Sequence, residues 1–222
     1  MLFENRQAAG RALARRLRTY AGRDDVVVLG LPRGGVPVAY EVAEAIGAPL
    51  DVFLVRKLGI PGHEELAMGA IASGGVQVLN PEILRTFDVT NRALESVIAE
   101  ERRELERRER SYRGGRPPLV LRGITVILVD DGLATGSSMK AAITAVRKLQ
   151  PARVVVAVPV APSSVFRDFQ GLADEVACAA TPEPFLAVGR FYENFDQTTD
   201  EEVREVLSRS AGKQPVAPGS RP

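Results

Sequence analysis

Four apolar segments rich in β-branched residues mark the strands of a buried sheet. They lie at 24–31, 50–57, 124–131 and 152–161. Their apolar residues are continuous rather than alternating, which is typical of parallel strands covered by helices on both faces. Stretches with helical spacing, 36–47 and 137–150, separate the first two strands and the last two. Because strand, helix and strand follow one another twice, the pattern predicts an α/β fold with a parallel sheet flanked by helices.

Three other patterned segments flank this predicted sheet. Residues 4–20 have the apolar spacing of an amphipathic helix, and the glycine-interrupted stretch 68–80 predicts a hairpin or short strands. Residues 91–113 predict an inserted charged helix, in which Glu and Arg leave only a narrow apolar stripe. Pairs such as Glu104 and Arg108 have the favourable i,i+4 order. We interpret this helix as a solvated arm or one half of a hairpin.

Charge and composition exclude several classes of partner and site. The 222 residues include 29 Lys and Arg and 28 Asp and Glu, so the net charge of +1 provides no basic field for a long nucleic acid. One cysteine and one histidine are too few for an internal disulfide or a cysteine-rich zinc site. No apolar run approaches the roughly 18 residues of a membrane span, so we expect a soluble, cytoplasmic protein. Residues 210–222, rich in Gly, Pro and Ser, are expected to form a disordered tail.

The most informative segment is ILVDDGLATGSSM at 127–139. A buried strand delivers two adjacent carboxylates, Asp130 and Asp131, to its C-terminal end, where ligands of open α/β sheets bind. The Gly/Thr/Ser loop that follows leads directly into a helix, so its N–H groups and hydroxyls form a seat for one phosphate. The carboxylates can accept hydrogen bonds from a sugar attached to that phosphate. The spacing therefore predicts a ribose 5-phosphate site, and the missing Gly-Lys-Ser/Thr ending distinguishes it from a Walker A loop.

Three segments resemble motifs of one known family. VDDGLATGSS resembles the phosphoribosyl diphosphate (PRPP) loop of type I phosphoribosyltransferases, closest in pattern to the adenine enzymes. GLPRGGVP at 30–37 resembles their pyrophosphate-binding loop, as in the xanthine enzymes. VRKLGIPGHEELAMGAI at 55–71 is similar to the Arg-Lys strand end and flexible loop of the adenine and orotate enzymes. The resemblance covers roughly residues 1–200 and implies a type I phosphoribosyltransferase-like fold with a small hood.

The resemblance implies a role for each matching residue of the first motif. Asp130 and Asp131 would hold the ribose 2′ and 3′ hydroxyls and, through water, the Mg²⁺ bound to the substrate diphosphate. The loop that would cradle the 5-phosphate consists of Ala134, Thr135, Gly136, Ser137 and Ser138. Alanine at position 134 matches the adenine enzymes and lacks the aspartate base of some purine enzymes.

The other two motifs would face the diphosphate. Arg33, Gly34 and Gly35 would bind the leaving pyrophosphate, and the resemblance implies a non-proline cis peptide bond near Pro32–Arg33. Arg56 and Lys57 would add positive charge. The residues to which the resemblance assigns catalysis are Asp130, Asp131, Arg33 and Lys57.

A flexible loop and a hood complete the implied site. Residues 58–66, with His63 and Glu64, would close over the diphosphate and exclude water, although an exposed loop histidine without a role is the commoner case. A hood from 1–23 and about 178–200 would hold the acceptor base. Its aromatic candidates, for stacking on the base or for core packing, are Phe185, Tyr192 and Phe195. We expect one domain over 1–209.

Together these features predict a Mg²⁺-dependent phosphoribosyltransferase of nucleotide salvage. It would transfer ribose 5-phosphate from PRPP to a nucleobase-like acceptor and release pyrophosphate. Its expected partners are these small molecules, with no nucleic acid or membrane, and similar enzymes are often homodimers. A regulatory protein that senses PRPP or a nucleotide on the same fold is the alternative, and an enzyme with another kind of acceptor is a third. The retained cations Arg33, Arg56 and Lys57 favour an enzyme.

Overall fold

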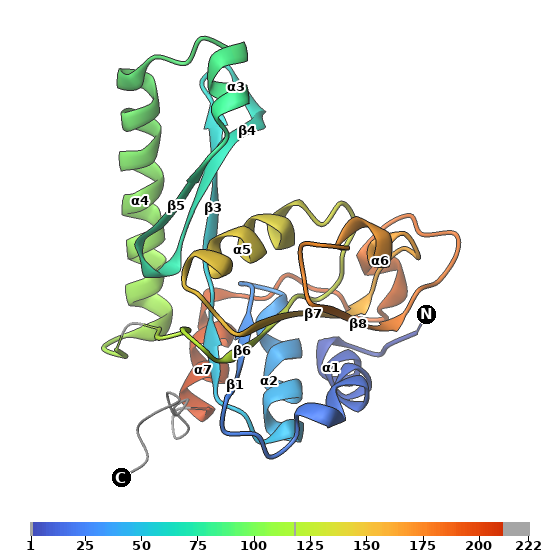
Figure 1. The fold of residues 1–222 in the computed structure, drawn as a ribbon. Helices are drawn as coiled ribbons and strands as arrows, with labels where there is room; N and C mark the ends of the chain where they lie inside the picture. Colours follow the sequence, from blue (N-terminus) through green and yellow to red (C-terminus); the bar gives the residue numbers. More distant parts are fainter. Residues whose placement is uncertain (1, 118, 211–222) are drawn as a thin grey trace.

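The larger of two sheets forms the centre of the molecule. The computed structural model describes residues 2–117 and 119–210 (Figure 1). Five parallel strands follow the order β2-β1-β6-β7-β8. These strands are β1 (Val26–Gly30), β2 (Leu50–Val52), β6 (Thr125–Val129), β7 (Arg153–Val160) and β8 (Glu175–Ala180). The predicted parallel sheet is confirmed, and β8 is an additional strand that the sequence pattern did not indicate.

Helices cover both faces of this sheet, as continuous apolar strands require. Helices α1 (Arg6–Ala14) and α2 (Gly35–Ile46) pack on one face, and α5 (Ser137–Lys148) and α6 (Val165–Asp168) on the other. Within β1, Val26 and Val28 join the first core and Val27 and Leu29 the second, because successive side chains point to opposite faces. The predicted helices at 36–47 and 137–150 are confirmed.

Elements near both ends of the described region pack on the same face of the parallel sheet as α1 and α2. A 3₁₀ helix, Arg15–Tyr20, continues α1, so the helix predicted over 4–20 exists in two parts. At the other end, α7 (Asp200–Arg209) buries Val203 and Leu207 in the same core as α2. Ser210 caps α7 and is buried, whereas 211–222 of the expected disordered tail lie outside the described residues.

A second, antiparallel sheet stands beside the first. Its strands are β3 (Val55–Ile60), β4 (His63–Ala72) and β5 (Val76–Leu79). The hairpin predicted over 68–80 is confirmed, with a 3₁₀ turn, Ser73–Gly75, between β4 and β5. The single strand predicted over 50–57 is wrong: Leu54 exchanges hydrogen bonds with Ser73, so pairing switches to β4 there. Buried residues continue through this switch, which is why the pattern resembled one strand.

The expected flexible loop at 58–66 is instead the end of the β3–β4 hairpin. The two strands pair through Ile60 and His63, with register shifts between Leu58 and Ile60. The turn between them contains Gly62 at φ 80°, in the left-handed region that glycine tolerates. In this structure the segment is therefore a β-hairpin, which extends away from the parallel sheet (Figure 1).

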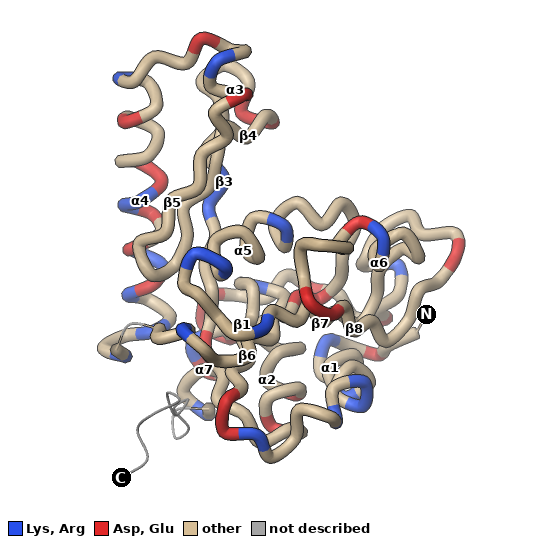
Figure 2. Tube along the Cα trace, in the orientation of Figure 1, with Lys and Arg blue, Asp and Glu red and all other residues tan. Residues whose placement is uncertain are grey.

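The antiparallel sheet lies between two helices. The short α3 (Pro81–Thr86) leads into the 23-residue α4 (Asn91–Arg113), which lies along the face that carries Arg56 and Gln77. Helix α5 contacts the same three strands from the face that carries Lys57. We call β3–β5 with α3 and α4 the arm; Figure 2 shows the mixed charges along α4.

The predicted charged helix is confirmed as α4, and its narrow apolar stripe packs against the core at Leu105 and also at Tyr112, which the prediction did not include. Leu105 and Tyr112 are only 4% and 5% exposed. Near its C-terminus, the Arg113 guanidinium donates to both carboxylate oxygens of the buried Asp51 in β2, at 3.0–3.2 Å. This ion pair joins the arm to the parallel sheet. In the described part of the chain, no helix combines the length with the apolar composition needed to cross a membrane.

Candidate functional site

Two adjacent carboxylates stand at the C-terminal end of β6. Asp130 Oδ1 accepts a hydrogen bond from the Asp131 backbone N–H at 2.9 Å. Asp131 Oδ2 accepts one from Arg6 Nε at 2.9 Å, and the Asp131 carbonyl accepts one from the Tyr192 hydroxyl at 2.5 Å. Burial raises the pKa of Asp130 well above its usual range, and the Asp131 charge raises it further. Burial also raises the pKa of Asp131, against the opposing effect of Arg6.

The two carboxylates have different surroundings. Asp131 is paired with Arg6, which also donates to the Asp196 carbonyl and lies 4.1 Å from the ring centre of Phe195. Asp130 has no ion-pair partner among the residues that the structure describes, and it lines a cleft of about 130 Å³. The family resemblance implied one shared role for both aspartates, but the structure places Asp130 in the cleft and ties Asp131 to the N-terminal helix.

Polar residues from four elements of the fold line this cleft. Its polar lining consists of Arg56, Arg108, Asp130 and Ser138, with Pro32 beside them. Asp130 comes from β6, Ser138 from the first turn of α5, Arg56 from β3 and Arg108 from α4. Two guanidinium groups, one carboxylate and a helix N-terminus can together bind an anion that also carries hydroxyls or a metal ion.

The loop after β6 presents its polar groups to solvent. Ala134, Thr135, Ser137 and Ser138 are exposed, whereas Leu133 and Gly136 are buried and fix the loop to the core. Gly136 has φ 69° immediately before α5, and the Thr135 and Ser137 hydroxyls lie 3.1 Å apart. The structure thus brings the predicted phosphate-binding residues 134–138 together at one helix N-terminus.

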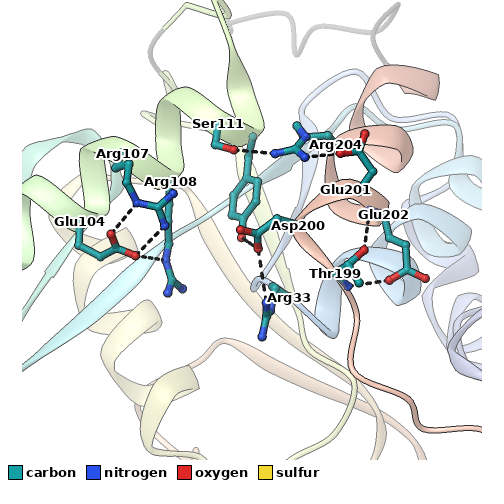
Figure 3. Close-up of polar contacts among 11 residues, drawn as sticks. Arg33, Glu104, Arg107, Arg108, Ser111, Thr199, Asp200, Glu201, Glu202 and Arg204 are labelled. Carbon is teal, nitrogen blue, oxygen red and sulfur yellow. Dashed lines mark hydrogen bonds and ion pairs between the residues drawn. The ribbon is translucent and has the colours of Figure 1, made fainter.

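Glycines allow the loop after β1 to approach the acidic pair. A Cβ added at Gly34 would lie 2.0 Å from Asp131 Oδ2, and one at Gly35 would lie 2.6 Å from the Val129 carbonyl oxygen. The cis peptide bond implied at Pro32–Arg33 is present. Arg33 Nη1 lies 3.5 Å from Asp200 Oδ1 in α7, and the same oxygen accepts a hydrogen bond from the Tyr112 hydroxyl at 2.6 Å (Figure 3).

Arg56 and Lys57 face different clefts, because neighbouring residues of a strand point to opposite sides. Arg56 donates to Glu101 of α4 at 2.5 Å and lines the Asp130 cleft. Lys57 lines a second cleft, of about 280 Å³, between the antiparallel sheet and α5, where Ser137 lies. The structure does not place Lys57 beside Asp130.

His63 and Glu64 lie at the far end of the β3–β4 hairpin. The His63 ring centre is 5.8 Å from that of Phe87, after α3. Glu64 accepts a hydrogen bond from the Gly62 backbone N–H at 3.0 Å. Neither residue lines the two clefts described here. A contact with the diphosphate remains a prediction that needs movement of the hairpin.

The predicted base-pocket aromatics form one cluster beside Asp131. Phe185 packs on Phe191 with ring centres 5.1 Å apart, and Tyr192 packs on Phe195 at 4.9 Å. Tyr192 is 3% exposed, so it offers little ring surface to a base, while Phe185 and Phe195 are half-buried. The cluster is fixed by pairing of the N-terminal segment with the 191–194 segment, in which the Phe3 N–H donates to Phe191 and Glu193 to Phe3.

Arg6 and Arg108 are site residues that the sequence analysis missed. Arg6 is 125 residues from its partner Asp131, and no local pattern indicates such a contact. Arg108 is one of many arginines on α4, and only its place on the stripe with Leu105 and Tyr112 distinguishes it. The i, i+3, i+7 spacing of Leu105, Arg108 and Tyr112 was the available signal.

Comparison with known proteins gives consistent results. A family model described as "Phosphoribosyl transferase domain" matches residues 2–168. A Mycobacterium tuberculosis (strain ATCC 25618 / H37Rv) protein named "Putative phosphoribosyl transferase Rv0571c" is 49% identical over 209 residues, which cover 94% of this chain and 47% of that protein. The chain thus spans about half the length of the curated relatives it matches.

Two further proteins are similar to this chain. The crystal structure of TT1426 from Thermus thermophilus has a TM-score of 0.83 and 46% sequence identity, and the match covers 96% of this chain and all of that one. The "Bifunctional protein PyrR" of Chloroflexus aurantiacus (strain ATCC 29366 / DSM 635 / J-10-fl) is 32% identical over 136 residues. That match covers 57% of this chain and 65% of that protein.

Proposed function

Because this chain belongs to the phosphoribosyl transferase domain family, we propose that it transfers ribose 5-phosphate from PRPP to a nitrogen of a nucleobase-like acceptor. The observation that supports this most strongly is the cleft in which Asp130, Arg56 and Ser138 meet at the edge of the parallel sheet. Its charges match the parts of PRPP: a 5-phosphate, a ribose diol and a diphosphate.

The proposed reaction exchanges one bond at ribose C1. The bond from C1 to the diphosphate oxygen breaks, and pyrophosphate leaves with the electron pair. An acceptor nitrogen supplies the lone pair for the new C1–N bond and then loses a proton. The sugar passes through a cationic, oxocarbenium-like state, so catalysis depends on alignment and on stabilising the departing negative charge.

The sheet edge would hold the sugar and the metal. Asp130 would accept hydrogen bonds from the ribose hydroxyls, and its half-buried carboxylate, which has no ion-pair partner in the described structure, fits a cation ligand. We propose that Asp130, and Asp131 through water, hold the Mg²⁺ that neutralises diphosphate charge, with substrate and water supplying its other oxygens. This fits the finding that, within the described ranges, no three acidic, His or Cys side chains gather as a metal cage.

The loops would hold the phosphates. Residues 134–138 and the α5 N-terminus would bind the 5-phosphate, and Lys57 would reach it from the cleft that it shares with Ser137. Arg56 would bind the diphosphate directly. Arg33 would do so after release from Asp200, to which its 3.5 Å ion pair is long and half-exposed.

The test measures pyrophosphate release from PRPP and Mg²⁺ against purines, pyrimidines and simple amines. We expect turnover with at least one acceptor. The double variant Asp130→Asn, Asp131→Asn should lose it while its circular dichroism stays native. Full activity of this folded variant would refute the assigned site.

The sensor alternative gives a different result in the same experiment. Tight PRPP binding by calorimetry without turnover on any acceptor would indicate a PRPP-sensing protein instead of an enzyme. Turnover on amines but not on nucleobases would support the proposed reaction and assign the acceptor to another chemical class. A role in nucleotide salvage depends on the first outcome, with a nucleobase as the acceptor.

A further inference from the structure

Two consecutive arginines of α4 share one carboxylate but face different surroundings. Glu104 accepts a hydrogen bond from Arg108 Nε at 2.6 Å and two from Arg107, at 2.7 and 3.0 Å (Figure 3). The Arg107 side chain is 56% exposed, whereas that of Arg108 is 35% exposed. Arg108 lines the cleft of Asp130, Arg56 and Ser138, and Arg107 does not.

The packing of α4 explains why Arg108 is the inward member of the pair. Glu101, Leu105, Arg108 and Tyr112 follow the i, i+4, i+7, i+11 spacing of one helix face. Leu105 is buried, Glu101 pairs with Arg56, and the Tyr112 hydroxyl donates to Asp200. Every member of this face therefore contacts the antiparallel sheet, α7 or the cleft. Arg108 therefore lies on a helix whose neighbouring turns are both packed.

The hydrogen bonds of Arg108 leave donors for a ligand. Glu104 occupies its Nε, and across residues 2–117 and 119–210 neither terminal Nη group has a hydrogen-bond acceptor within reach. A guanidinium presents its donors in a planar fork that matches phosphate oxygens. The charges of Arg33 and Arg108 both lower the pKa of Asp200, after the larger effect of the Tyr112 hydroxyl.

We propose that Arg108 is a further ligand of the substrate diphosphate, supplied by α4 from outside the three motif segments. This inference rests on the proposed function, because it assigns a partner for the leaving group. Together with Arg56 of β3, Arg108 would give the cleft that Asp130 lines two guanidinium groups. The arm would then be part of the binding site for the leaving pyrophosphate.

The experiment compares Arg108→Gln with the matched control Arg107→Gln. Both variants remove one charge and one Glu104 partner from the same turn of α4. Calorimetric titration with inorganic pyrophosphate, in the presence of Mg²⁺, gives the dissociation constant of each. We expect Arg108→Gln to weaken binding about tenfold to a hundredfold, as loss of a charge-assisted hydrogen bond does. Arg107→Gln should stay within about twofold.

A second variant, Arg108→Lys, keeps the charge and the helix but loses the planar fork. It should bind pyrophosphate with intermediate affinity. If the wild type binds pyrophosphate and Arg108→Gln binds as tightly as Arg107→Gln, the role of Arg108 is refuted and the proposed function stands. If the wild type binds neither pyrophosphate nor PRPP, both the function and the role of Arg108 fall. A native melting curve for each variant shows that affinity, not folding, has changed.

Discussion

The edge of the parallel sheet and the arm both place charged residues at one cleft, but the surroundings of these charges differ. Asp130 is half-buried at the end of a core strand and has no ion-pair partner in the described structure. Its burial, and then the Asp131 charge, raise its pKa. The arm contributes Arg56 and Arg108, which are partly exposed and are each paired with a glutamate of α4. A half-buried carboxylate without an ion-pair partner destabilises the empty protein and gains from a cation or donor. The arginines are already paired without ligand, and Arg108 keeps its terminal Nη groups for a second anion.

This difference in surroundings implies that the sheet edge and the arm tolerate changes of position to different degrees. The sheet edge must be fixed in advance, because Asp130, the glycine loop and the α5 N-terminus all depend on core packing. The arm needs only to bring its arginines within reach. It shares apolar cores with both faces of the sheet and is also joined to it by the ion pair between Asp51 and Arg113. The comparison can be tested at that joint, at the glycine loop and at Asp130.

Breaking the joint should have the largest effect on stability. Asp51→Ala leaves the buried Arg113 unpaired, which costs about 3–5 kcal/mol of unfolding free energy. Asp25→Ala is the control, because its pair with Arg23 is about two-fifths exposed and its loss costs about 1 kcal/mol or less. Urea denaturation measures both. Equal losses would mean that the joint is no stronger than a surface pair.

Adding a side chain to the glycine loop after β1 should have the next largest effect on stability. In Gly34→Ala the new methyl would lie 2.0 Å from Asp131 Oδ2, so the loop or the carboxylate must move, at about 1–3 kcal/mol. Gly115→Ala is the control, because a Cβ there meets nothing within 4 Å and the residue is not in the left-handed region. Urea denaturation should show a loss only for Gly34→Ala, together with weaker pyrophosphate binding. An unchanged Gly34→Ala would show that the sheet edge is as adaptable as the arm.

Neutralising Asp130 should give the smallest effect and a gain in stability. Its folded pKa is raised above the unfolded value near 3.8, so protonation stabilises the fold below that value and the benefit disappears as pH rises through the folded pKa. Asp130→Asn should therefore melt above the wild type at pH 7, by about 2–4 °C for each kcal/mol gained, and the difference should shrink on acidification.

Asp25→Asn is the control, and it should shift the melting temperature in the opposite direction. The Arg23 hydrogen bond lowers the pKa of Asp25, so its charged form stabilises the fold and the variant should melt slightly below the wild type at pH 7. Scanning fluorimetry between pH 4 and 8 follows both variants. A decrease for Asp130→Asn would mean that the Asp130 charge is compensated in the free protein.

Much of the fold could be predicted from the sequence because its signals are local. Continuous apolar strands, helix spacing and the VDDGLATGSS segment specified the parallel sheet and the loop at its edge. The switch of partner at Leu54 could not be predicted, because both sheets bury that segment. The pairing of Arg6 with Asp131 and the inward position of Arg108 depend on tertiary contacts between distant segments. The cleft residues Asp130, Ser138 and Arg56 were therefore predicted from local motifs, whereas Arg6 and Arg108, which no local motif marks, were missed.

The adjacent positions of Arg56 and Lys57 have an evolutionary consequence. The register shifts of the β3–β4 hairpin begin only after Leu58, so both cations lie in regular strand and face opposite clefts. Inserting or deleting one residue just before them would exchange these faces in a single genetic event. The same slip would also move the buried Leu58 and Ile60 away from the core. The faces of the two cations are therefore fixed by the same register that packs the arm, and neither can change side without the other.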